Sequence, residues 1–237
     1  MKLKDKVALI TGGVRGIGKA VALAYAREGA RLALCSRTES EIDGTVRELQ
    51  GLKAEAKGWV CDVSSEEPVK DLVQEVHKAY GRIDVLVNNA GVMTRPTSVA
   101  EFDVKKWDYT IAVNLRGPFL VTREVLPLMI RQKSGSIINV SSGLGRMGYA
   151  NFSAYSVSKW GLEGFTQVLA AELRSNNVRV NSVDPGYVAT KITHHQGRDP
   201  DSVTEVFVFL ASDESRGTTG SMLSSSKWMS EIRQRRG

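Results

Sequence analysis

The chain has 237 residues, 42% of them hydrophobic and 24% charged, and a formal net charge of +6 at pH 7. That length suits one α/β domain, and the composition is that of an ordinary soluble globular protein. The sequence has no run of the roughly 20 apolar residues that a membrane span requires and no secretion signal at its start, so we expect a cytoplasmic protein.

The two cysteines, Cys35 and Cys61, lack the CxxC spacing typical of zinc sites and are too few for a disulfide scaffold. We expect both to be small buried groups at the ends of strands. The adjacent histidines His194 and His195 are interpreted as part of a flexible polar loop, because neighbouring residues rarely direct their side chains at one ion. The sequence therefore predicts no metal site.

Short apolar runs alternate with longer segments of helical periodicity. In chain order, the runs that predict strands buried on both faces are Lys6–Ile10, Arg31–Cys35, Ala56–Cys61, Ile83–Val87, Ser136–Val140 and Val178–Val183. The first predicted helix covers about Ile17 to Glu28, and Ser64 with Glu67 has the spacing of a capping box at the start of another helix. Alternating strands and helices favour right-handed crossovers. We therefore predict a single-domain Rossmann-type α/β fold over residues 1–237, with a doubly wound parallel sheet between two layers of helices.

The first predicted strand leads into the glycine-rich turn Thr11-Gly12-Gly13-Val14-Arg15-Gly16-Ile17-Gly18 and then directly into a helix. Such a unit binds a pyrophosphate, because glycines let the backbone approach it and the helix N-terminus offers free N–H groups. We therefore assign Gly12, Gly16, Ile17 and Gly18 to cofactor binding. The spacing departs from GxGxxG, since position 21 is Val, and a tight turn that binds no ligand is the alternative interpretation.

The end of the second predicted strand indicates which dinucleotide is bound. An acidic residue there would favour a free ribose 2′-hydroxyl, but the sequence has Ser36 and Arg37, and Arg15 lies inside the glycine turn. Arginine binds phosphate oxygens through paired N–H donors, so these three residues predict NADP(H) as the cofactor. A surface position for Arg37 at the start of the next helix is the alternative.

Further motifs follow in order: Asp62-Val63, Asn88-Asn89-Ala90-Gly91, Asn114, Ser142, Tyr155-x3-Lys159 and Pro185-Gly186. Together with the glycine turn they make the chain resemble the short-chain dehydrogenase/reductase family from about Lys6 to Ser212. The resemblance implies an oxidoreductase that moves a hydride between NADP(H) and the carbon of a carbonyl or secondary alcohol. Ketones, aldehydes and 3-oxoacyl groups are the implied substrates, with reduction as the expected direction. It also implies a homo-oligomer, either a tetramer or a dimer.

The same resemblance implies the catalytic residues. Tyr155 and Lys159 are four positions apart and share one helix face, so the lysine ammonium is expected to lower the pKa of Tyr155, the general acid and base. Ser142 would hold the substrate oxygen, with the adjacent Ser141 as the alternative. Asn114 would bind a water molecule that links Lys159 to solvent. An amide that only satisfies local backbone groups is the alternative at this position.

The remaining motif residues are implied to position the cofactor. Asp62 would accept a hydrogen bond from the adenine amino group, with Val63 beside the ring, and Lys159 would hydrogen-bond the nicotinamide ribose. The segment after the fourth strand would approach the adenine ribose, and the segment after the sixth strand would face the nicotinamide. This set comprises Asp62, Val63, Asn89, Ala90, Gly91, Tyr155, Lys159, Pro185, Gly186, Val188 and Thr190. Asp184 is given no role.

The loop at about 191–201 is shorter than the apolar lid that is common in the family, and this predicts a shallow or open substrate pocket. The expected apolar substrate contacts precede this loop in the chain: Leu144, Met147, Tyr149 and Phe152. Arg95 and Arg146 are the arginines that would meet an acidic group of a substrate. The identity of the substrate stays open.

The segment from about 224 to 237 is interpreted as a polar, basic tail that includes Arg233, Arg235 and Arg236, and a short seventh strand at Met222–Leu223 stays open before it. The alternatives to catalysis are an NADP(H)-binding sensor without turnover, a nucleic-acid or scaffold protein that uses this tail, and a sugar-nucleotide epimerase. The intact catalytic residues argue against a sensor, and the dispersed positive charge argues against nucleic acid. We therefore predict a small-molecule substrate and neither a nucleic-acid nor a membrane partner.

Overall fold

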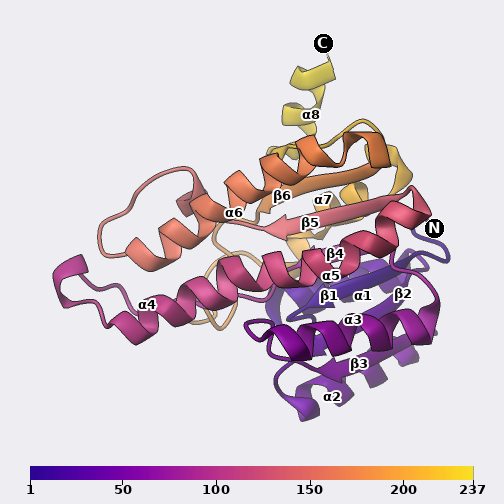
Figure 1. The fold of residues 1–237 in the computed structure, drawn as a ribbon, viewed down its shortest axis with the longest axis horizontal. Helices are drawn as coiled ribbons and strands as arrows, with labels where there is room; N and C mark the ends of the chain where they lie inside the picture. The colour runs from indigo at the N-terminus through magenta and orange to yellow at the C-terminus, as the bar shows by residue number, and fades with distance from the viewer. Residues whose placement is uncertain (237) are drawn as a thin grey trace.

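Seven parallel strands form the centre of the fold in the computed structural model, which describes residues 1–236 (Figure 1). The strands lie in the order β3-β2-β1-β4-β5-β6-β7. Their bounds are β1 (Val7–Thr11), β2 (Arg31–Ser36), β3 (Ala56–Val60), β4 (Val85–Asn88), β5 (Gly135–Val140), β6 (Val178–Asp184) and β7 (Met222–Ser224). From β1 the chain moves outward to β3 and then returns to β4 on the other side of β1. This reversal opens a crevice at the carboxyl ends of β1 and β4, where open α/β sheets bind ligands.

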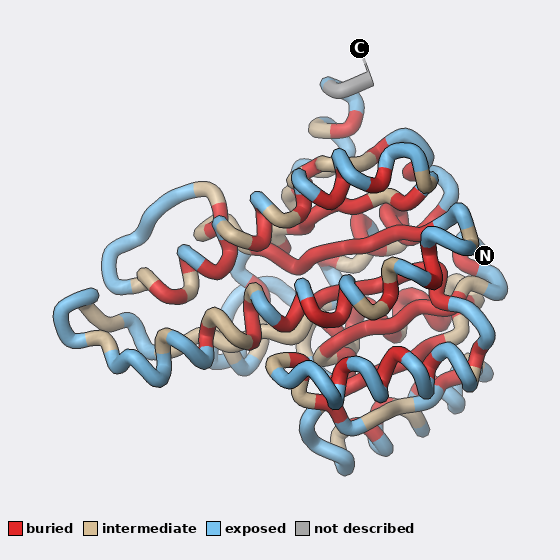
Figure 2. Tube along the Cα trace, viewed as in Figure 1, coloured by how far each residue is buried: buried red, intermediate tan, exposed pale blue. Residues whose placement is uncertain are grey.

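Helices cover both faces of the sheet and leave its strands buried between them (Figure 2). One face carries α1 (Gly16–Arg27), α2 (Glu39–Gly51) and α7 (Thr204–Ala211). The other carries α3 (Glu66–Tyr80), α5 (Gly117–Gln132) and α6 (Ser153–Glu172). The remaining helices are α4 (Val104–Ile111) and α8 (Trp228–Arg236), with a π-helical segment, η2 (Ala112–Arg116), between α4 and α5. Short 3-10 turns are η1 (Val99–Glu101), η3 (Gly143–Gly145), η4 (Arg174–Asn176), η5 (Pro200–Val203) and η6 (Asp213–Ser215).

The predicted three-layer fold with a doubly wound parallel sheet is confirmed. Every residue of β1 and of β5 is buried, which explains the unbroken apolar runs in the sequence. The observed strands begin and end within a residue or two of the predicted ones. The expectation of burial on both faces is wrong for β3, because this strand lies at the edge of the sheet and leaves Lys57 and Val60 exposed. Both cysteines are buried at strand ends, as predicted.

The predicted capping box at the start of α3 is wrong. The residue that precedes the helix is Ser65, and its side chain accepts no capping hydrogen bond. Ser64 instead turns back along the chain, and its hydroxyl donates to Oδ1 of Asp62 at 2.7 Å. The reason is that Asp62, at the end of β3, is a nearer and charged acceptor for this hydroxyl.

The C-terminal segment returns to the body of the protein. The ring of Trp228 packs on Phe209 of α7 with ring centroids 4.8 Å apart, and Ile232 is buried. The Glu231 carboxylate accepts the backbone N–H of Ser224, which ties α8 to β7. Within the tail predicted here, the side chains of Arg235 and Arg236 and the whole of Gly237 lie outside the described residues. Within the described chain, no helix is long and apolar enough to cross a membrane.

The contact between α1 and α7 generates a stability prediction. Tyr25 is fully buried, and its hydroxyl donates to the carbonyl oxygen of Phe207 at 3.0 Å. Replacing Tyr25→Phe removes this bond without opening a cavity, so we expect the free energy of unfolding to fall by about 1 kcal/mol. Urea unfolding followed by circular dichroism measures the change. The control is Tyr149→Phe, at a tyrosine that is 66% exposed; equal effects in the two variants would contradict the prediction.

Candidate active site

A cleft of about 1400 Å³ opens at the carboxyl ends of the central strands. Its walls come from the glycine turn after β1, the ends of β2 to β6, the start of α6 and the loop after β6. All the predicted site residues except Gly18 and Asn114 line this cleft. Segments that lie far apart in the sequence are therefore brought to one place, and the two exceptions lie behind the cleft wall.

The glycine turn approaches the cleft with backbone geometry that requires glycine. Gly12 and Gly16 have positive φ angles of 61° and 50°, which side-chain-bearing residues rarely adopt. At Gly18 a Cβ atom would lie 2.3 Å from the carbonyl oxygen of Gly12 and 2.4 Å from Nδ2 of Asn89. The first turn of α1 contains no acidic side chain, and Arg15 before it makes no side-chain cap. This helix start fits the phosphates of a dinucleotide.

Two arginines flank the entrance at the end of β2. Arg15 forms an ion pair with Glu41, with 3.1 Å between Nη1 and Oε1. Arg37 is hydrogen-bonded to the hydroxyl of Tyr109, and its guanidinium carbon lies 5.9 Å from the centroid of that ring. Both arginines are exposed, and contacts of this kind at the surface contribute little. Both guanidiniums are thus available to a phosphate at the edge of the cleft.

Asp62 lies at the end of β3 with its carboxylate held by the next turn. The backbone N–H and the hydroxyl of Ser64 donate to its Oδ1 at 3.0 and 2.7 Å. Burial opposes ionisation, but the two bonds from Ser64 and the charge of Arg37 outweigh it and lower the pKa of Asp62. The group is therefore an ionised acceptor at neutral pH, as a contact to an adenine amino group requires.

Tyr155 and Lys159 project from α6 into the same part of the cleft. The Lys159 Nζ lies 5.6 Å from the centroid of the Tyr155 ring and donates to the carbonyl oxygen of Val140 at 2.7 Å. Lys159 is only 5% exposed, whereas Tyr155 is half-buried. The expectation that Lys159 lowers the pKa of Tyr155 is not met: burial raises the pKa of Tyr155 to about 12, and the hydrogen bond with Ser142 reduces that rise only in part.

Ser142 is the serine that faces Tyr155. Its side chain hydrogen-bonds with the tyrosine, and it also accepts the backbone N–H of Leu144 at 3.2 Å at the start of η3. Ser141 lines the same cleft but is more deeply buried, and its hydroxyl has no hydrogen-bond partner. The geometry therefore favours Ser142 over Ser141 for contact with the reacting oxygen.

Asn114 is fully buried in the π-helical segment η2. Its Oδ1 accepts the backbone N–H of Val92 and its Nδ2 donates to the carbonyl oxygen of the same residue, both at 2.8 Å. Nδ2 also lies 3.2 Å from the hydroxyl of Ser158, which in turn donates to the carbonyl oxygen of Tyr155. This is an amide that satisfies local backbone groups and braces the turn of α6 that carries Tyr155. The water relay through Asn114 stays a prediction.

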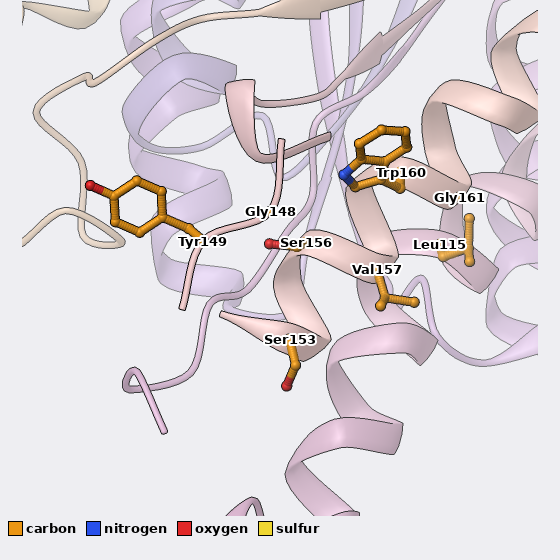
Figure 3. A pocket seen from close by; sticks show the side chains of 8 residues that line it. All are labelled: Leu115, Gly148, Tyr149, Ser153, Ser156, Val157, Trp160 and Gly161. Carbon is orange, nitrogen blue, oxygen red and sulfur yellow. The ribbon is translucent and has the colours of Figure 1, made fainter. Parts of the chain in front are cut away.

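The expected apolar substrate contacts lie elsewhere. Leu144, Met147, Tyr149 and Phe152, in η3 and the loop after it, do not line the main cleft. Tyr149 instead borders a second, surface hollow of about 560 Å³, which Val157 and Trp160 of α6 also line from the other side (Figure 3). Of the two arginines suggested for acidic substrates, Arg95 lines the main cleft and Arg146 does not.

The loop after Thr190 lines one end of the cleft with a short turn. Ala189 donates to the carbonyl oxygen of Arg198, and Arg198 donates to that of Tyr187, so the loop is pinned at its base. His194 and His195 are exposed on this turn and border the cleft. Within residues 1–236 no group of three metal-ligating side chains is found.

Sequence reasoning gave no role to two carboxylates near α6. The negative charge of Asp184, at the end of β6, contributes to the raised pKa of Tyr155. Glu163 lies one helical turn beyond Lys159 and is 3% exposed. The position of Glu163 could have been predicted, since an acidic residue four positions after a lysine lies on the same face of a helix.

The close approach at Gly18 generates a binding prediction. In Gly18→Ala the added methyl group would displace Gly12 or Asn89, so the turn opens and the affinity for NADPH falls by about tenfold or more. The control is Gly44→Ala in α2, where a Cβ meets nothing within 4 Å. Titration of tryptophan fluorescence measures both dissociation constants. Unchanged affinity in Gly18→Ala would show that the turn does not hold the dinucleotide.

Comparison with known proteins assigns the chain to a family. Residues 6–201 match the family model described as short chain dehydrogenase. The 3-oxoacyl-(acyl-carrier-protein) reductase FabG of Thermotoga maritima is 41% identical over 239 residues, which cover 94% of this chain and 97% of that protein. A Shigella flexneri 2a protein solved in complex with NADP has a TM-score of 0.90 at 29% identity, covering 95% of this chain and 98% of that chain. An NAD⁺-bound xylitol dehydrogenase has a TM-score of 0.90 at 30% identity, covering 94% of this chain and 98% of that chain. This chain belongs to the short-chain dehydrogenase family and is an oxidoreductase that uses a nicotinamide dinucleotide.

Proposed function

We propose that this chain is an NADPH-dependent carbonyl reductase that acts on the 3-oxo group of a 3-oxoacyl thioester. The observation that carries the proposal is the meeting of Ser142, Tyr155 and Lys159 in the cleft that the glycine turn borders. A proton donor, an oxygen-binding hydroxyl and a cation beside a dinucleotide site are the groups that carbonyl reduction requires.

Ser142 and Tyr155 act on the substrate oxygen. When bound, NADPH supplies the hydride that adds to the carbonyl carbon. Tyr155 donates its hydroxyl proton to the carbonyl oxygen, and Ser142 hydrogen-bonds to that oxygen as negative charge develops on it. Burial keeps the pKa of Tyr155 at about 12, so its hydroxyl is protonated at neutral pH. This state suits a proton donor and supports reduction as the favoured direction.

Lys159 supplies positive charge beside the tyrosine. Burial lowers its pKa to about 8, while the negative charge of Glu163 acts in the opposite direction. The ammonium is therefore the majority form at pH 7 and becomes the minority form above pH 8. In the charged form it places a positive charge 5.6 Å from the centroid of the Tyr155 ring. Lys159 also binds the nicotinamide ribose in this proposal, together with the hydroxyl of Tyr155.

The cofactor proposed is NADP(H), held along the length of the cleft. The glycine turn with Gly12, Gly16, Ile17 and Gly18 would hold the pyrophosphate, while Ser36 and the two arginines at the end of β2 would bind the 2′-phosphate. The other assigned contacts are Asp62, Val63, Asn89, Ala90, Gly91, Pro185, Gly186, Val188 and Thr190. The absence of an acidic residue at position 36 or 37 supports this choice over NAD(H).

A 3-oxoacyl thioester is proposed as the substrate because the Thermotoga maritima reductase is similar over nearly its whole length. The short loop after Thr190 supports a substrate that extends out of the cleft. The alternative is oxidation of a polyol with NAD⁺, which the likeness to xylitol dehydrogenase favours. For both candidate functions we propose a cytoplasmic location and a small-molecule substrate.

We further propose that the chain acts as a homo-oligomer, a dimer or a tetramer. Its support is an apolar outer face on α5 and α6, where large side chains are exposed. These are Phe119, Val157, Trp160 and Val168. A second copy that covers them would remove this apolar surface from water.

Turnover tests the reaction. Purified protein should oxidise NADPH, followed by absorbance, when it is given a 3-oxoacyl thioester, and Tyr155→Phe should lower kcat at least about a hundredfold because the proton donor is lost. The matched control is Tyr149→Phe outside the cleft. Tight NADPH binding without turnover of thioesters, ketones or aldehydes would favour a sensor. Turnover of polyols with NAD⁺ alone would favour the alternative.

The arginine at the end of β2 tests the cofactor. In Arg37→Asp the guanidinium that binds phosphate becomes a carboxylate that repels it. We expect KM for NADPH to rise about tenfold or more, while NADH is used at least as well as by the natural chain. Arg47→Asp, exposed on α2 and outside the cleft, is the control for the change of charge. Equal effects on NADPH and NADH would mean that Arg37 does not select the cofactor.

A further inference from the structure

A carboxylate lies under the catalytic lysine in the interior of the protein. Glu163 follows Lys159 by one turn on the face of α6 that packs on the sheet, and the two residues are 3% and 5% exposed. Its Oε2 accepts a hydrogen bond from the Ser182 hydroxyl of β6 at 2.5 Å. Its Oε1 is buried and has no hydrogen-bond partner. An acidic group in such a place is costly unless something compensates for its charge.

Lys159 supplies a positive charge one turn away on the same face of α6. Its Nζ donates to the carbonyl oxygen of Val140, which satisfies one hydrogen but supplies no charge. The charge of Glu163 acts directly on the ammonium and favours its protonated form. No ion pair within 4.0 Å joins Lys159 or Glu163 to a described side chain, including each other, so the charge of Glu163 acts on the ammonium across a longer gap. The two charges therefore balance each other across one helical turn.

The other charged groups near this pair lie to its sides or point away. Tyr155 is on the same helix, Asp184 is at the end of β6 beside Tyr155, and Arg146 follows η3. On β6, Arg179 reaches the opposite face of the sheet, where it binds Leu210 and Ser212. On η2, Arg116 binds the carbonyl oxygen of Ser64. The neighbouring parts of β5 and β7 contribute no charged residue.

We propose that Glu163 is a positioning residue for Lys159, a buried counter-charge that keeps the lysine ammonium protonated and in place at neutral pH. This proposal rests on the function proposed above. Ser182 orients the carboxylate from the sheet, and the carboxylate acts on Lys159 through its charge across one helical turn. The substrate and the cofactor touch Lys159 and not Glu163, since Glu163 does not line the cleft. Its effect is thus on the charge of Lys159 and not on substrate binding.

The pH dependence of turnover tests this role. In the natural chain kcat should fall above about pH 8, where Lys159 loses its proton. Glu163→Gln keeps the size and the hydrogen bond to Ser182 but removes the charge, so the fall should move to lower pH by about one unit, a tenfold loss on that limb. At about pH 6, where Lys159 is charged in both proteins, kcat should agree within about twofold, and KM for the thioester should not change. Glu163→Asp should restore most of the profile.

A second readout keeps the test independent of turnover. Reductive methylation of Lys159 with formaldehyde, mapped by mass spectrometry, reports the neutral amine, and its onset should move to lower pH in Glu163→Gln. Glu172→Gln, exposed at the end of the same helix, is the control. If the natural chain turns over no thioester, the proposed function fails, and the methylation experiment alone still tests the role of Glu163.

If Glu163→Gln does not fold, Ser182→Ala should move the pH profiles of turnover and of methylation in the same direction. An unshifted onset, or a loss of kcat equal at every pH, overturns the proposal.

Discussion

Hydrogen bonds between the ends of β1 and β4 fix where the cleft lies. The side chain of Asn89 donates to the carbonyl oxygens of Thr11 and Gly12 at 2.9 and 3.0 Å. In return, the Thr11 hydroxyl accepts the backbone N–H groups of Asn89 and Ala90. These bonds hold the ends of β1 and β4 together beyond the last paired residues of the two strands. Because the glycine turn begins at Thr11 and Gly12, these hydrogen bonds fix the distance between the glycine turn and the segment after β4. It also leaves no room for a side chain at Gly18.

A row of buried polar side chains gives α6 its position over the sheet. Asn88 donates to Asn139 at 2.9 Å, and Asn139 donates to Thr166 of α6 at the same distance. Next along the sheet, Ser182 donates to Glu163 of the same helix. Apolar packing alone tolerates small shifts of a helix, whereas buried amides lose their hydrogen bonds when the helix moves. This row therefore explains how α6, which carries Tyr155 and Lys159, is held in one register and why its polar residues lie inward.

Sequence reasoning succeeded where spacing along one element decides the outcome. The glycine turn, the strands of the centre and the pairing of Tyr155 with Lys159 follow from local pattern and fold class. It failed where the decisive partner is distant or compensating. Ser64 binds Asp62, a competing acceptor two positions before it, instead of capping α3. The apolar residues after Ser142 were predicted to line the substrate pocket, yet none of them lines the cleft. Such outcomes depend on which of several acceptors or faces lies nearer in space.

Burial acts in opposite directions on the two titratable groups of the reaction centre. It disfavours the phenolate of Tyr155 and the ammonium of Lys159, because both are the charged forms. For Tyr155 the nearby charge of Asp184 adds to this effect, so the hydroxyl keeps its proton. For Lys159 the charge of Glu163 opposes it, so the ammonium survives to about pH 8. Burial thus keeps Tyr155 protonated at neutral pH, with Asp184 adding to it, whereas Glu163 favours the protonated form of Lys159 against burial. At neutral pH such a site holds the proton that a carbonyl reduction consumes, in line with the direction proposed for this chain.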